Sequence, residues 1–131
     1  MNTLRTPLSK VKGLGSAKDG TDHFWLQRIT AIALAPLCLW FCFSLASLPS
    51  MNYVEFTQWL SSPFRAVMML LVIMVAFYHA ALGLQVVIED YVGDAAIRTG
   101  GIIAVKMLCA LLAVTGVFSI LKIALTATTG S

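Results

Sequence analysis

The sequence predicts an all-α membrane protein with three transmembrane helices, and the distribution of its charges is the main reason. Of its 131 residues, 59% are hydrophobic and 11% are charged, whereas soluble domains average about 25% charged residues. Charges are absent from 29 to 48 and from 66 to 88, and a third apolar stretch from 106 to 125 has only a lysine near each end. Each stretch approaches the roughly 20 residues that a helix needs to cross a bilayer.

We expect a polar N-terminal segment, residues 1–22, and one transmembrane anchor domain, residues 23–131. We also expect a short interfacial helix over residues 52–60, which place aromatic side chains three apart. What remains outside the spans is too short for a flavin or nucleotide domain. The chain is therefore predicted to be non-catalytic on its own. If it takes part in redox chemistry, the other half of that chemistry is on partner subunits. The predicted spans are about 24–48, 64–91 and 101–125.

The basic residues predict the topology. By the positive-inside rule, the N-terminus and the loop 89–101 are cytoplasmic, and the loop 49–63 and the C-terminus are periplasmic. Nucleic-acid binding is disfavoured, because the basic residues are scattered and have no interleaved aromatic residues. The cytoplasmic set is Arg5, Lys10, Lys12, Lys18, Arg28, Arg98 and Lys106, and the opposite side has Arg65 and Lys122.

His79 lies inside the second apolar stretch. An ionisable side chain at that depth costs free energy, which makes a functional role the first hypothesis. A neutral imidazole is a common ligand of iron, although it can also form a hydrogen bond with a neighbouring helix. A low-spin haem needs a second axial ligand, and His23 is at the membrane edge. The iron hypothesis therefore predicts a heteromeric helix bundle in which another chain supplies that ligand.

Small residues surround His79 on its helix face, since Ala76, Ala80 and Gly83 lie within about 60° of it. Such a face allows a neighbouring helix to approach closely. It also leaves room for a flat macrocycle beside the imidazole. The spacing does not favour one use over the other.

Asp90 follows His79 by eleven residues, which brings it to within about 20° of the same helix face and about 16 Å further along the axis. Tyr91 is the next residue, and its hydroxyl can donate a hydrogen bond to a quinone carbonyl. The carboxylate of Asp90 could pass protons from the cytoplasm. The alternatives are an interfacial anchor for Tyr91 and an ordinary solvated charge for Asp90.

These residues resemble a known family. The segment 79–92 is similar to the second membrane helix of the succinate dehydrogenase hydrophobic membrane anchor subunit, the D subunit of complex II. Residues 23–31, HFWLQRITA, resemble the lead into that family's first helix, where an arginine precedes a Thr-Ala step. The length and the three spans also agree, so the resemblance covers nearly the whole chain. The family's histidine, its glycine four residues on and its Asp-Tyr pair are matched by His79, Gly83, Asp90 and Tyr91.

The resemblance implies that His79 is an axial ligand of haem b, shared with a histidine of the companion cytochrome b subunit. It implies that Tyr91 forms a hydrogen bond with ubiquinone and that Asp90 lies near that site. It also suggests that Arg28 lies near the haem propionates or the rim of the quinone site. The other partners implied are the iron–sulfur subunit and the flavoprotein subunit.

Together, the residues and the resemblance predict a membrane anchor of succinate:ubiquinone oxidoreductase, complex II of the tricarboxylic acid cycle and respiratory chain. It is expected in a bacterial or mitochondrial inner membrane, with haem b and ubiquinone as cofactors. Two alternatives stay open: the anchor of a fumarate reductase, which works in the opposite direction, and a non-redox three-helix scaffold in which His79 only packs.

Overall fold

The computed structural model describes residues 18–129 and the side chains of residues 21–126. Residues 1–17, most of the predicted N-terminal segment, lie outside this part. Every element of regular structure within residues 18–129 is a helix, which confirms the all-α prediction. The four helices are α2 (Lys18–Ala46), α3 (Tyr53–Leu60), α4 (Pro63–Tyr91) and α5 (Ala95–Thr129).

Helices α2, α4 and α5 are long and apolar enough to cross a membrane. In the most apolar part of each, at most 17% of the residues are buried by the chain itself. In water such exposed surface would be unfavourable, whereas lipid or other apolar helices can cover it. The three predicted spans are thus present, and most of their surface is available to lipid or to other chains.

Helix α2 begins before its expected span and ends two residues short of it, α4 matches its span closely, and α5 extends beyond its span at both ends. Helix α5 begins at Ala95 rather than near residue 101. The side chain of Asp94 explains this start, because its Oδ1 accepts hydrogen bonds from the backbone N–H groups of Ala96 and Ile97, both at 2.9 Å. This is how an N-cap residue satisfies the free donors of a first helical turn. Only residues 92–94 connect α4 to α5.

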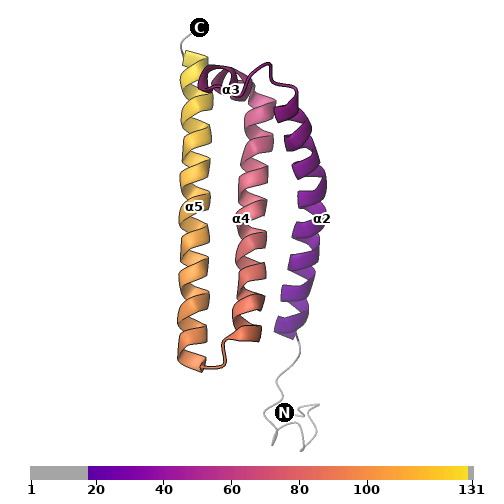
Figure 1. Cartoon of the computed structure of the whole chain (residues 1–131), viewed down its shortest axis with the longest axis vertical. Coiled ribbons are helices and arrows are strands. Elements are labelled where there is room, and N and C mark those ends of the chain that lie inside the picture. Colours follow the sequence, from indigo (N-terminus) through magenta and orange to yellow (C-terminus); the bar gives the residue numbers. More distant parts are fainter. Residues whose placement is uncertain (1–17, 130–131) are drawn as a thin grey trace, which may run out of the picture.

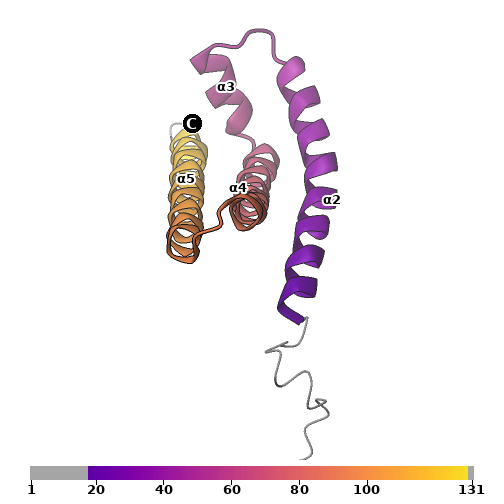
Figure 2. The same cartoon turned by 60° about the horizontal axis from the view of Figure 1, so that its bottom comes forward.

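Helix α4 occupies the middle of the arrangement and packs against both α2 and α5 (Figure 1). Within the described residues, the backbones of α2 and α5 do not come close to each other. The view in Figure 2 likewise shows α2 and α5 on different sides of α4. The chain therefore forms an open layer of three helices rather than a closed bundle, which leaves both broad faces uncovered.

The short helix α3 confirms the helix predicted near residues 52–60. Asn52 caps it, since its side-chain oxygen accepts a hydrogen bond from the backbone N–H of Glu55 at 2.8 Å. Trp59 and Leu60 at its other end are buried against α4 and α5, and this small core fixes the end of the layer where the C-terminus lies. The buried members of the cluster are Trp59, Leu60, Ala66, Met69 and Ile120.

Two glycines of α5 face isoleucines of α4. A Cβ atom on Gly101 would lie 3.6 Å from the nearest atom of Ile88, which is ordinary van der Waals contact. A Cβ atom on Gly116 would lie 3.0 Å from Ile73, which is tighter than most real contacts. The two helices are therefore packed more tightly at Gly116 than at Gly101.

This difference predicts the effect of an added methyl group. Gly116→Ala is expected to have a free energy of unfolding about 1–3 kcal/mol lower than that of Gly101→Ala, because it overpacks the contact with Ile73. Both variants gain a similar helix propensity, up to about 1 kcal/mol, so this gain cancels in the comparison. Thermal unfolding of the membrane-extracted protein measures the difference. Equal stabilities would mean that Ile73 moves aside without cost.

Candidate functional site

The imidazole of His79 points from α4 towards α2. Its Nδ1 atom lies 2.8 Å from the hydroxyl oxygen of Thr30. Thr30 is the one polar residue among the described side chains that is buried, with 9% of its surface exposed. His79 itself is half-buried, and no residue in the described part of the chain forms a hydrogen bond with its Nε2 atom.

The hydroxyl of Thr30 also contacts the backbone of its own helix. Its oxygen lies 2.8 Å from the carbonyl oxygen of Leu26 and 3.1 Å from that of Gln27. Both carbonyl groups can only accept a hydrogen bond, whereas the hydroxyl has a single hydrogen to donate. Thr30 therefore joins the backbone of α2 to the imidazole of α4.

One turn closer to the N-terminus of α2, Gln27 reaches the small residues beside His79. The side-chain nitrogen of Gln27 would lie 3.3 Å from a Cβ atom on Gly83. Gly83 thus serves close approach between α2 and α4, one of the two uses expected for the small face. The Oε1 atom of Gln27 and the Nε2 atom of His23 are buried and have no hydrogen-bond partner in the described part of the chain. Buried polar atoms of this kind usually bind a water or another group.

Helix α4 is unbroken from His79 to Tyr91, so the predicted alignment of Asp90 above His79 is retained. Asp90 is exposed, and 85% of the Tyr91 surface is exposed. The nearby carboxylate of Glu89 accepts a hydrogen bond from Gln85 at 2.7 Å. Asp90 and Tyr91 have no such partner among residues 18–129, so both side chains are available to a ligand or to another chain.

Arg28 is not brought to the same side as His79. Its guanidinium group lies over the ring of Phe24, 4.6 Å from the ring centroid, and its side chain is exposed. Arg28 and Thr30 are two residues apart on α2, which separates them by about 200° around the helix. Arg28 therefore faces away from the contact between Thr30 and His79.

Sequence reasoning did not single out Thr30 or Gln27. The signal was present, because His23, Gln27 and Thr30 are spaced four and then three residues apart in α2. This spacing places them on one helix face. A polar stripe on a membrane helix indicates a polar partner on its neighbour, which is His79 in this structure.

The described residues do not form a metal site by themselves. Within residues 18–129, no three side chains of histidine, cysteine, aspartate or glutamate are grouped closely enough to hold a metal ion. Cys38 and Cys42 are exposed, Cys109 is buried, and all three are free thiols. If His79 binds iron, the remaining ligand must come from another molecule.

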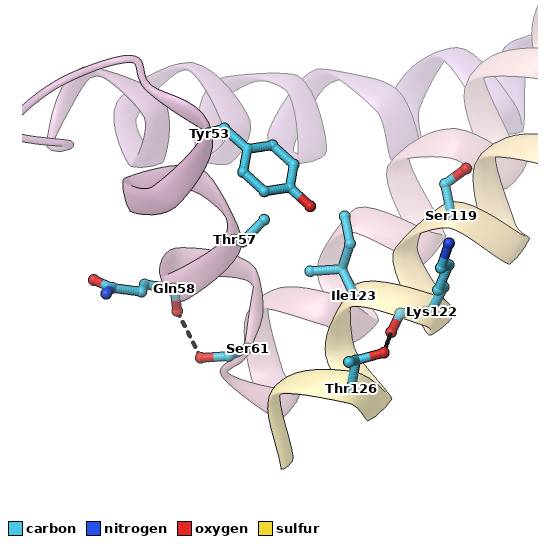
Figure 3. Close-up of a pocket in the computed structure, with 8 residues that line it drawn as sticks. All are labelled: Tyr53, Thr57, Gln58, Ser61, Ser119, Lys122, Ile123 and Thr126. Atoms are coloured by element: carbon cyan, nitrogen blue, oxygen red, sulfur yellow. Dashed lines mark hydrogen bonds between the residues drawn. The ribbon is translucent and has the colours of Figure 1, made fainter. Parts of the chain in front are cut away.

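The larger cavities lie away from these residues. A cavity of about 600 Å³ lies between α3 and the last turns of α5 (Figure 3). This is the opposite end of the layer from the end of α4 at Tyr91 (Figure 1). A second, more apolar cavity of about 460 Å³ lies between α4 and α5, where Lys106 is its charged residue. Neither cavity is lined by His79, Asp90 or Tyr91. The first is lined by Tyr53, Thr57, Gln58, Ser61, Ser119, Lys122, Ile123 and Thr126.

Comparison with known proteins identifies the chain at the level of its family. Residues 2–118 match the family described as succinate dehydrogenase/fumarate reductase transmembrane subunit. The chain is 43% identical over 106 residues to the succinate dehydrogenase hydrophobic membrane anchor subunit of Rickettsia bellii, covering 79% of this chain and 83% of that protein. It is 32% identical over 118 residues to the anchor subunit of Rickettsia typhi, covering 89% and 94%.

A more distant relative is the succinate dehydrogenase hydrophobic membrane anchor subunit of Paracoccus denitrificans, which is 31% identical over 86 residues and is matched over 67% of its length. These matches agree with the three long apolar helices described above. The chain therefore belongs to the succinate dehydrogenase/fumarate reductase transmembrane subunit family, as a multi-pass membrane anchor subunit of succinate dehydrogenase.

Proposed function

We propose that this anchor contributes one axial ligand of haem b, the Nε2 atom of His79, and one wall of the site where ubiquinone is reduced, at Tyr91. The observation that carries the proposal is the environment of His79. Its Nδ1 is within hydrogen-bond distance of Thr30, while its Nε2 has no partner within the described residues. Histidine ligands of metals almost always engage their second ring nitrogen in this way.

The residues present fit a b-type haem. His79 is flanked by the small side chains of Ala76 and Ala80, which leave room for a flat macrocycle, and α4 has uncovered surface on both faces of the layer. When bound, such a haem accepts and releases one electron at a time. A histidine of the cytochrome b subunit would provide the second ligand. Arg28 is exposed on another side of α2. It would reach a haem propionate or the rim of the quinone site only if the cytochrome b subunit packs against that side of the anchor.

At Tyr91 the proposed role is to orient the quinone. The phenol donates a hydrogen bond to a carbonyl oxygen of ubiquinone, and the neighbouring carboxylate of Asp90 transfers protons from water at the membrane edge. Reduction of the quinone to the quinol consumes two electrons and two protons. The iron–sulfur subunit supplies the electrons, which the flavoprotein subunit takes from succinate.

Fumarate reductase anchors belong to the same family, and nothing in His79, Asp90 or Tyr91 sets the direction of electron flow. Succinate oxidation is favoured because the relatives compared above are all named as succinate dehydrogenase anchors. A non-redox scaffold would leave the unpartnered Nε2 of His79 without a purpose.

His79→Ala is expected to remove the b-type haem signal from the assembled complex, because the iron would lose the ligand that His79 supplies. Reduced-minus-oxidised visible spectra of the purified complex measure this signal. His23→Ala is the matched control, since it removes the second histidine of the chain and should leave the signal in place. An unchanged spectrum in His79→Ala would contradict the proposed ligand role.

Tyr91→Phe is expected to lower kcat/KM for ubiquinone reduction by about twofold to twelvefold, as the loss of one neutral hydrogen bond of about 0.5–1.5 kcal/mol implies. Succinate oxidation by an artificial acceptor that bypasses the quinone site should be unchanged. Tyr53→Phe is the control, because Tyr53 is similarly exposed but lies at the opposite end of the layer. If Tyr91→Phe lowered both activities equally, Tyr91 would be a stability residue.

We also propose that the N-terminus and the connection at residues 92–94 face the cytoplasm. Arg98 and Lys106 follow that connection, whereas the opposite end of the layer has only Arg65 and Lys122 among the described basic residues. The positive-inside rule therefore assigns the first end to the cytoplasm.

Single cysteines introduced on a cysteine-free background test this topology. A cysteine at residue 93 is expected to resist a membrane-impermeant thiol reagent in intact cells, whereas one at residue 51 is expected to react. Labelling of inverted membrane vesicles should reverse the pattern. The same pattern in cells and in inverted vesicles would contradict the proposal.

A further inference from the structure

We propose that Thr30 is a positioning residue for the haem ligand. Its hydroxyl oxygen accepts a hydrogen bond from the Nδ1–H group of His79 and thereby fixes Nε2 as the nitrogen that binds iron. This inference rests on the proposed ligand role of His79 and deepens it, because it names the group that orients the imidazole and sets its tautomer.

The direction of the hydrogen bond follows from the contacts of the hydroxyl. The oxygen of Thr30 lies 2.8 Å from the carbonyl oxygen of Leu26 and 3.1 Å from that of Gln27. A threonine in a helix commonly donates its single hydrogen to a carbonyl group three or four residues earlier. The hydroxyl then presents a lone pair to the imidazole.

The tautomer of His79 follows from this direction. Its Nδ1 atom is 2.8 Å from the same hydroxyl oxygen. With the hydroxyl hydrogen directed to α2, the hydrogen between Thr30 and His79 must come from Nδ1. A neutral imidazole has one N–H group, so Nε2 retains the lone pair that a metal requires.

The surroundings of Thr30 hold this arrangement in place. Only 9% of its surface is exposed, so water does not compete for the hydroxyl. The β-branched side chain has few rotamers in a helix, and the bond to the carbonyl group selects one of them. The hydroxyl is therefore oriented by α2 itself, independently of any cofactor or partner subunit.

The hydrogen bond has a chemical consequence for the iron. A partner on Nδ1–H raises the basicity of the ligating nitrogen and fixes the plane of the ring. A more basic ligand favours ferric over ferrous iron. Thr30 should therefore lower the midpoint potential of the haem, and loss of its hydroxyl should raise that potential.

The test compares three variants in the assembled succinate dehydrogenase complex. Thr30→Val removes the hydroxyl while keeping the shape of the side chain, and Thr30→Ser keeps the hydroxyl. Thr115→Val is the matched control, because the Thr115 hydroxyl also donates to the carbonyl group four residues earlier, at 2.8 Å, and contacts no histidine. The readouts are the midpoint potential of the haem and the low-spin ferric electron paramagnetic resonance spectrum.

In Thr30→Val we expect a higher midpoint potential and shifted resonance positions, while Thr30→Ser and Thr115→Val match the parent complex. Loss of such a partner typically weakens metal binding by at least about tenfold. If the ferric form alone were bound tenfold more weakly, the midpoint potential of the haem would rise by about 59 mV, since the couple transfers one electron.

An unchanged potential and spectrum in Thr30→Val would overturn the proposal. If Thr30→Val fails to assemble, Thr30→Cys replaces it, since sulfur is only a weak acceptor. In Thr30→Cys, a rise in midpoint potential that is smaller than the rise expected for Thr30→Val supports the proposal. A midpoint potential equal to that of the parent complex overturns it.

His79→Ala separates this failure from failure of the proposed function. If His79→Ala loses the haem signal while Thr30→Val behaves as the parent complex, only the role of Thr30 is wrong. If His79→Ala keeps the signal, both proposals fall.

Discussion

The contact between Thr30 and His79 is the constraint on which the arrangement of α2 and α4 depends. An imidazole inside a bilayer cannot exchange hydrogen bonds with water, so each nitrogen left unpaired raises the free energy of the folded state. The hydroxyl of Thr30 engages one nitrogen at 2.8 Å and fixes which faces of the two helices meet. Gln27 packs against Gly83 one turn away, so the same interface also holds a close contact between α2 and α4. The other nitrogen of His79 has no hydrogen-bond partner among the described residues.

The second constraint is the openness of the layer. Helix α4 separates α2 from α5, and the chain buries only a small part of each span. A closed bundle would enclose His79 within one chain. The open layer instead leaves surface beside it that lipid or another chain can cover. The core around Trp59 and Leu60 stabilises one end of the layer, and the other end has only the short connection at residues 92–94.

Helix α4 also sets the distances in the proposed mechanism. Because it is unbroken to Tyr91, the level of His79 and the level of Asp90 differ by about 16 Å along one rigid axis. The proposed haem ligand is thus deep in the membrane, and the proposed quinone and proton groups are at its edge. The side chain of Arg28 faces away from His79 and stacks on Phe24. Its charge is therefore directed towards another surface of the anchor.

The sequence by itself determined the three spans, the short helix α3 and the alignment of Asp90 with His79, because hydropathy and helical periodicity are local properties of the chain. It could not determine what the imidazole meets. The pairing of His79 with Thr30 joins residues 49 positions apart and depends on how two helices rotate about their axes. Sequence periodicity gives the face of a helix but not its neighbour. The tertiary structure decided that α2, rather than α5, presents the hydroxyl, because α2 packs against the face of α4 that carries His79 and Gly83.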